Sequence, residues 1–190
     1  NPKAQCQDGI DNDGDGKIDL EDSGCESLQD NDEYDAPACI PVSTPEDLDN
    51  VRNNLAGSYC QMNDIDLAGY DFKPIGNKTN PFTGSRFDGG NYEIRNFYYE
   101  TSLPYAGIFG VVNGTGIANI KLKNVTIIST NSYVGSLVGD CINGSIYNSG
   151  VDDVYIDASG ANSGNVGGLV GFNPSCDIIS SYSINGKISS

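Results

Sequence analysis

Glycine and isoleucine recur with one fixed spacing along the C-terminal half of the chain. Three times, an isoleucine follows a glycine by seven residues, and a second isoleucine follows after a further ten. The units begin 29 and 32 residues apart, and self-similarity at such a period is typical of solenoids, propellers and related arrays. The units are marked by Gly110, Ile117 and Ile127, by Gly139, Ile146 and Ile156, and by Gly171, Ile178 and Ile188.

Each unit contains three short apolar patches separated by Gly and Asn. This is too little for a four-stranded propeller blade, but it is enough for one coil of a parallel β-helix, in which equivalent isoleucines would stack into ladders. A polar residue follows the first isoleucine by two positions, as Asn119, Asn148 or Ser180. We therefore predict an all-β parallel β-helix, with an antiparallel sandwich as the alternative. Two less regular coils are expected upstream, on Ile65, Leu67, Phe87, Ile94, Phe97 and Tyr99.

One helix is predicted ahead of the strands, at about residues 45–56. Thr44 can act as its N-cap, Pro45 suits the first helical position, and the two acidic residues that follow favour the positive end of the helix dipole. Gly57 supplies a stop. A single apolar stripe predicts that this helix forms a lid on the end of the sheet stack, and it consists of Leu48, Val51 and Leu55.

The negative charge of the chain is concentrated in its first 35 residues. The net charge is −16, and this segment contributes −10 of it, because twelve acidic residues stand against Lys3 and Lys17. An acidic block this dense either stays disordered or binds cations. Nucleic acid and anionic membrane surfaces are therefore poor partners for it.

Six cysteines in a chain without histidine indicate disulfides rather than a zinc site. Disulfides belong to oxidising compartments, so we expect a secreted, cell-surface protein whose signal peptide has been removed. No apolar run reaches transmembrane length. Six cysteines allow fifteen connectivities. Their positions favour pairing Cys6 with Cys25, Cys39 with Cys60, and Cys141 with Cys176, the last pair lying in equivalent turns of successive coils.

The sharpest chemical signal is an acidic loop between Cys6 and Cys25. Residues 11–22 read DNDGDGKIDLED, with oxygen ligands at loop positions 1, 3, 5 and 9, a glycine at position 6 and an acid at position 12. Position 12 is an aspartate where an EF-hand loop has glutamate, so a lower affinity is expected. A solvated acidic linker is the alternative. The predicted Ca²⁺ ligands are Asp11, Asp13, Asp15, Lys17 through its carbonyl, Asp19 and Asp22, and a second, weaker ion would use Asp30 and Asp32.

Two resemblances extend this interpretation. About residues 43–190 resemble the GLUG repeat region of bacterial and archaeal surface proteins. The resemblance is carried by three short segments, GIFG, GSLVG and GGLVG, and by the lead-in before them, TPEDLDNVRNNLAGSYCQMNDIDLAGYDFKPIG and FTGSRFDGGNYEIRNF. This implies a right-handed β-helix in an adhesin-like protein, with GLUG-like coils at 105–190. The Cys-bracketed DNDGDG loop resembles thrombospondin type 3 repeats, which implies structural calcium. The expected domains are the calcium-binding module at 1–39 and the solenoid with its capping helix at 40–190.

The predicted last coil has no cap, because the chain ends at Ser190, two residues after Ile188. Solenoids normally protect their final coil, so we expect either a longer protein or another molecule over this end. In the second case the open end of one subunit packs on the capped end of the next, a contact that propagates into a filament.

We therefore predict an extracellular, calcium-stabilised structural protein, a subunit of a filament assembled head to tail. The alternative is a fragment of a larger cell-surface adhesin that binds carbohydrate or protein. The expected partners are the chain itself, another surface protein or glycans. Glycosylation stays open, because this composition yields about as many sequons by chance as occur at Asn77, Asn113, Asn124 and Asn143.

A polysaccharide lyase or hydrolase is the less favoured alternative, since parallel β-helices also host such enzymes on carboxylate pairs. The chain lacks His and Trp, and with them the commonest general base and the best ring for stacking on a sugar. We therefore interpret it as a non-enzyme. The candidate catalytic residues would be Asp88, Asp152 and Asp153 with Arg86 or Arg95, and the hint of an adhesive aromatic cluster is Tyr98, Tyr99 and Tyr105.

Overall fold

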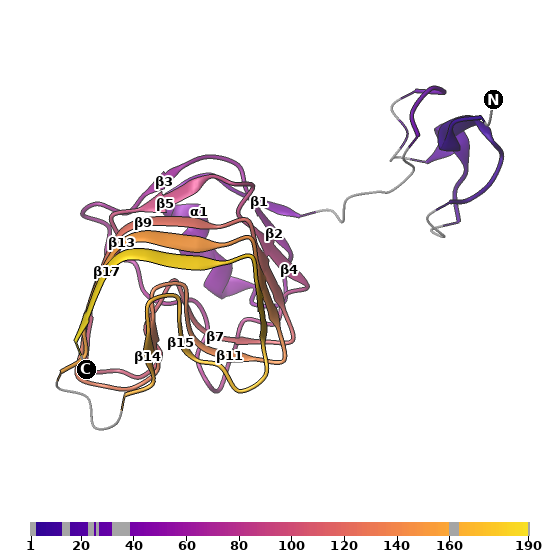
Figure 1. Cartoon of the computed structure of the whole chain (residues 1–190). Helices are drawn as coiled ribbons and strands as arrows, with labels where there is room; N and C mark the ends of the chain where they lie inside the picture. The colour runs from indigo at the N-terminus through magenta and orange to yellow at the C-terminus, as the bar shows by residue number, and fades with distance from the viewer. Residues whose placement is uncertain are drawn as a thin grey trace. The chain divides into compact units, whose positions relative to one another are not determined.

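The chain divides into two compact units, Asn1–Ala38 and Cys39–Ser190, and each is described by itself. The fold is given by a computed structural model (Figure 1). The residues that it describes are 3–12, 16–22, 25, 27–31, 39–159 and 164–189.

The N-terminal unit contains two single-turn 3-10 helices, η1 (Gln5–Gln7) and η2 (Asp19–Glu21). The Cys6–Cys25 disulfide joins η1 to the chain after η2, with the two Cα atoms 5.7 Å apart, and Cys6 is buried. Apolar side chains such as Ile10 and Leu20 are exposed. A unit this small cannot be stabilised by a hydrophobic core alone, and the disulfide cross-link stabilises it instead.

The second unit is a β-solenoid of about four turns, in which every strand pairing is parallel (Figure 1). The predicted fold class is thereby confirmed. One face is a six-stranded sheet of short parallel strands. Its strands, in order, are β1 (Ile40–Val42), β2 (Tyr59–Gln61), β4 (Arg86–Asp88), β8 (Gly116–Ala118), β12 (Ser145–Tyr147) and β16 (Asp177–Ile179).

The second face carries the longest strands of the solenoid, which lie stacked above one another in Figure 1. Because these strands bury alternate side chains along up to nine residues, they supply much of the core. They are β3 (Ile65–Asp66), β5 (Glu93–Arg95), β9 (Lys121–Ser129), β13 (Gly150–Asp157) and β17 (Tyr182–Ser189), with β6 (Tyr98–Thr101) also pairing with β9.

The third side of each coil folds back on itself. Figure 1 shows β14 (Val166–Gly167) and β15 (Val170–Phe172) running beside each other around a tight bend. Glycine is required at position 139 on this side of the coil, since a Cβ there would lie 2.8 Å from the carbonyl oxygen of Tyr133. The remaining strands here are β7 (Phe109–Asn113), β10 (Val134–Gly135) and β11 (Val138–Ile142).

The strand register confirms the ladders that the spacing predicts. Ile146 is paired with Ile117 on one side and Ile178 on the other, and Ile156 is paired likewise with Ile127 and Ile188. Equivalent residues therefore point the same way in successive coils, and the inward isoleucines form continuous apolar columns.

Aromatic residues continue these columns into the less regular N-terminal coils. Phe87 takes the ladder position of Ile117, and Tyr59 takes it one coil earlier. Phe87 and Phe109 meet edge to face with ring centroids 5.3 Å apart, and both are fully buried. Each such ring contributes about 1.5–3 kcal/mol through burial. Five phenylalanines are fully buried in this way, namely Phe72, Phe82, Phe87, Phe97 and Phe109.

The predicted helix is present but shorter than expected. It is α-helical over α1 (Pro45–Asn50) and continues as one 3-10 turn, η3 (Val51–Asn53). Thr44 forms a capping box with Asp47, because its hydroxyl accepts from the Asp47 N–H at 3.1 Å and the Asp47 carboxylate accepts from the Thr44 N–H at 3.1 Å. The last turn tightens and Asn54 leaves the helical region, so the helix ends before residue 56.

Candidate functional site

The predicted calcium loop curls back on itself through its carboxylates. Oδ2 of Asp11, at loop position 1, accepts a hydrogen bond from the N–H of Gly16, at position 6, at 3.0 Å. Gly16 has a φ of +95°, a conformation that glycine adopts readily. Oδ1 of Asp19, at position 9, accepts from the N–H of Gly9 at 3.0 Å. The first bond closes the turn between positions 1 and 6, and the second ties position 9 to Gly9, which lies before the loop.

The last predicted ligand is the one that the structure buries. The Asp22 side chain is shielded from solvent, and its carbonyl oxygen accepts from the N–H of Cys25 at 3.3 Å, next to the disulfide. Lys17 is exposed. Asp13 and Asp15 lie outside the described residues, as does Asp32.

The described part of this unit does not by itself assemble a metal centre. Among residues 3–12, 16–22, 25 and 27–31, no three acidic or cysteine side chains converge as a metal site would need. Calcium binding by Asp11, Asp19 and Asp22 therefore stays a prediction.

The other two predicted disulfides are also formed. Cys39 is bonded to Cys60 beside the capping helix, and Cys141 is bonded to Cys176 between neighbouring coils, with Cα atoms 5.8 Å apart. All three predicted pairings are thus confirmed. The Cys141–Cys176 bond fastens the last described coil to the one before it.

That last coil has an uncovered face. Ile146 is fully buried, whereas its ladder partner Ile178 is 42% exposed, and Ile188 is 45% exposed at the end of the other column. Strands β16 and β17 are the terminal strands of their sheets, so each also presents an unpaired backbone edge. The face therefore combines apolar side chains with free hydrogen-bonding groups in a row.

The carboxylates that could serve an enzyme are engaged in structural contacts. Oδ1 of Asp88 accepts from the Nδ2 of Asn119 at 2.9 Å, and the same carboxylate forms an ion pair with Arg86. Asp152 lies on β13, in a different sheet from Asp88 on β4, and accepts from the Nδ2 of Asn185 at 2.7 Å. These two carboxylates do not form a pair.

Asp153 and Arg95 are likewise part of the scaffold. Asp153 has a φ of +62° at a bend of β13, next to Asn124 and Asn185, which adopt the same conformation in the neighbouring coils. Arg95 forms an ion pair with Asp66 on the preceding coil, with Nε and Oδ2 3.2 Å apart. The proposed catalytic set is therefore spread over corners and sheet faces.

One buried charged residue, Asp140, was not predicted from the sequence. Asp140 on β11 is buried, and its Oδ2 lies 3.1 Å from the Nζ of Lys78, 62 residues earlier in the chain. The hydrogen bond that Lys78 donates to Asp140 raises the pKa of Lys78 above its usual value, because the carboxylate favours the ammonium form. No spacing pattern links two residues so far apart in sequence.

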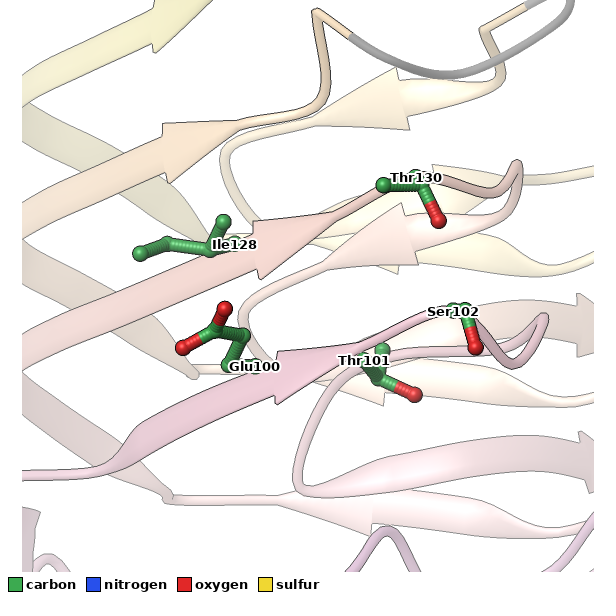
Figure 2. Close-up of a pocket in the computed structure, with 5 residues that line it drawn as sticks. All are labelled: Glu100, Thr101, Ser102, Ile128 and Thr130. Atoms are coloured by element: carbon green, nitrogen blue, oxygen red, sulfur yellow. The ribbon is translucent and has the colours of Figure 1, made fainter.

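The aromatic residues divide between core and surface. Tyr99 is buried, so the prediction that it belongs to an exposed cluster is wrong. Tyr105 is half-buried and stacks on Tyr133 with centroids 5.0 Å apart. Tyr98 is exposed on β6. Beside it lies a shallow hollow of about 300 Å³, lined by Glu100, Thr101, Ser102, Ile128 and Thr130 (Figure 2).

One comparison with a solved structure supports the fold, and the family stays open. No family model matches the chain. A protein of Evansella cellulosilytica named "Putative Gly-rich membrane protein" is 34% identical over 111 residues, which cover 52% of this chain and 13% of that protein. The chain thus spans a small part of this relative's length.

A solved structure shares the architecture. The crystal structure of a "putative immunoglobulin A1 protease" from Bacteroides ovatus matches with a TM-score of 0.50 and 19% identity, over 78% of this chain and 68% of that one. At this identity the likeness shows the fold alone. Across the described residues, no helix has the length and apolar character needed to cross a membrane.

Proposed function

We propose that this chain is a structural β-solenoid module of an extracellular, surface-associated protein, and that its last coil stacks on a further β-coil. The observation that carries the proposal is the uncovered face at Ile178 and Ile188. The same ladder positions are fully buried one coil earlier, at Ile146 and Ile156. A stacked coil would continue both columns without any change of register.

The energetics favour covering this face. Each exposed isoleucine would gain on the order of 1 kcal/mol from full burial, and the edges of β16 and β17 would gain backbone hydrogen bonds. The finer proposal is that a second copy supplies the covering surface. That contact joins two different ends of the solenoid, so it does not close and it propagates into a filament.

Three disulfides support an extracellular location, because such bonds persist in oxidising compartments. The relative from Evansella cellulosilytica carries the words "membrane protein" in its name, which is compatible with a place at the cell surface. The acidic spacing of residues 11–22 and the turn that Asp11 closes onto the N–H of Gly16 support calcium as a structural ion of the N-terminal unit.

A structural role is favoured over a catalytic one because the candidate carboxylates hold the corners of coils. Asp88 and Asp152 lie in different sheets and accept hydrogen bonds from Asn119 and Asn185. The protease named for the structural neighbour is a property of that protein, and 19% identity does not transfer it. An adhesive role is compatible with a scaffold and depends on a ligand-binding face.

Sedimentation velocity over a range of concentrations tests the stacking face. We expect the wild-type chain to form larger species as concentration rises, and the double variant Ile178→Lys/Ile188→Lys to stay monomeric. Ile179→Lys is the matched control, since Ile179 is exposed on the neighbouring outward position. A wild-type chain that stays monomeric throughout, or a double variant that assembles like wild type, would contradict the proposal.

A further inference from the structure

Two exposed tyrosines occupy one row on the outer face of the long-stranded sheet. Tyr98 on β6 is paired in register with Thr126 on β9, and Thr126 is paired with Tyr155 on β13. Tyr98 is 55% exposed and Tyr155 is 36% exposed. The row continues to Lys187, whose Nζ lies 5.7 Å from the centroid of the Tyr155 ring.

The spacing within this row is set by the coils. Neighbouring strands lie about 4.8 Å apart, so residues two coils apart on one row are separated by roughly 9.5 Å. The backbone positions of Tyr98 and Tyr155 therefore repeat at a distance close to one disaccharide unit of an extended β-1,4-linked polysaccharide. In such a chain successive sugars are turned over, so the same sugar face recurs at every second residue.

A shallow hollow adjoins the tyrosine row. Glu100 and Ile128 lie two residues after Tyr98 and Thr126 on their strands, so they form the next row of the same outer face. Figure 2 shows Glu100 beside Ile128, with Thr101, Ser102 and Thr130 along the same edge. Together they offer one carboxylate and three hydroxyls around about 300 Å³.

Glu100 also forms a hydrogen bond with Tyr98. The hydroxyl of Tyr98 donates to Oε2 of Glu100 at 2.9 Å, which fixes the ring against the sheet. This hydrogen bond raises the pKa of Tyr98 above its usual value. Its ring is then held in place before any ligand binds, which lowers the ordering cost of binding.

We propose that this outer face binds a neutral, extended β-1,4-linked polysaccharide lying along the solenoid axis. The CH faces of alternate sugars would pack on Tyr98 and Tyr155, while sugar hydroxyls would donate to Glu100 and exchange hydrogen bonds with Thr130. A neutral chain fits because charges of both signs lie on this face, with Lys187 at one end of the row and Glu100 beside the other. The proposal goes beyond the scaffold role and gives the solenoid a ligand.

Isothermal titration calorimetry with cellohexaose, xylohexaose and chitohexaose tests this proposal. We expect at least one of the three to bind, and Tyr98→Ala/Tyr155→Ala to weaken its affinity about ten-fold or more. Tyr98→Phe keeps the ring and should retain most of the binding. Tyr147→Ala is the matched control, because Tyr147 is 52% exposed on β12, in the other sheet, and its removal should leave the affinity unchanged.

The possible results of these titrations either support the binding site or overturn it. Loss of binding in the double variant, with unchanged thermal unfolding and an unaffected Tyr147→Ala, supports the site. Absence of binding by all three oligosaccharides, or equal affinity of the double variant and wild type, overturns it. Neither result bears on the stacking face, because Tyr98 and Tyr155 lie on a side of the solenoid and Ile178 and Ile188 lie at its end.

Discussion

The side-chain amide of Asn148 donates from Nδ2 to the Oδ1 of Asn119 on the preceding coil at 2.8 Å. Asn119 in turn donates to Asp88 at 2.9 Å, one coil further. Both asparagines have positive φ, +46° and +57°, at the corner between the two six-stranded sheets. This corner therefore combines a backbone conformation that few residues adopt easily with a hydrogen-bond ladder that runs along the solenoid axis.

Replacing Asn119 tests both parts of this corner. Asn119→Ala should destabilise the solenoid by about 2–3 kcal/mol, because it removes two side-chain hydrogen bonds and leaves alanine in a left-handed conformation. Asn119→Gly loses the same bonds but tolerates the backbone, so it should cost about 1 kcal/mol less. Urea unfolding of the two variants measures the difference, and equal stabilities would show that the backbone conformation is not a constraint.

The buried Asp140 gives a second prediction. Lys78→Met leaves this carboxylate without its cation and should destabilise the fold by about 3 kcal/mol. The equivalent position one coil earlier is Val111, which is buried. Lys78→Met/Asp140→Val should therefore recover most of the loss. Thermal unfolding of single and double variants checks this, and a double variant no more stable than Lys78→Met would contradict it.

Calcium removal should act on one unit only. With chelator we expect protease cleavage within residues 1–31, while the solenoid stays intact, because the N-terminal unit has little apolar surface to bury. Asp22→Asn should weaken calcium binding ten-fold or more by calorimetry, whereas Glu21→Gln, at an exposed neighbour outside the predicted ligand set, should not. Equal cleavage with and without calcium would argue against a structural ion.

The capping box makes helix stability depend on pH. Hydrogen bonds from the Ser43 N–H, then from Thr44, lower the pKa of Asp47 below 3.8. A lowered folded-state pKa gives stability that is complete above the unfolded value and is lost as pH falls through the folded value. Asp47→Asn should therefore cost about 0.5–1 kcal/mol at pH 7 and progressively less toward about pH 2.

Urea unfolding of wild type and Asp47→Asn across this pH range measures the effect. Glu46→Gln is the control, since Glu46 lies in the same first turn but outside the capping box. A constant gap between wild type and Asp47→Asn at every pH would exclude a role for the ionised carboxylate.

The ladders were predictable because each coil repeats the same geometry. Gly139, Ile146 and Ile156 keep fixed separations, and a parallel stack converts equal separation into vertical alignment. The capping helix was predictable from Thr44 and Pro45, which act locally. The Cys141–Cys176 pairing followed from the same reasoning, because these two cysteines lie in equivalent turns.

Other features depend on register that the sequence does not reveal. Tyr98 and Tyr99 are neighbours with the same side chain, and only the pairing of β6 with β9 decides that the first points outward and the second inward. The Lys78–Asp140 pair joins two coils through a side-chain contact. The fold-back between β10 and β11 was also missed, since two-residue strands leave no periodic signal.

Amide hydrogen exchange on the last coil tests the central claim most directly. Strand β17 has one neighbour, β13, whereas β13 lies between β9 and β17. If the open face stacks on a further coil, exchange in β17 should slow as protein concentration rises, while exchange in β13 stays constant. Exchange in β17 that is equally fast at every concentration would contradict stacking through this face.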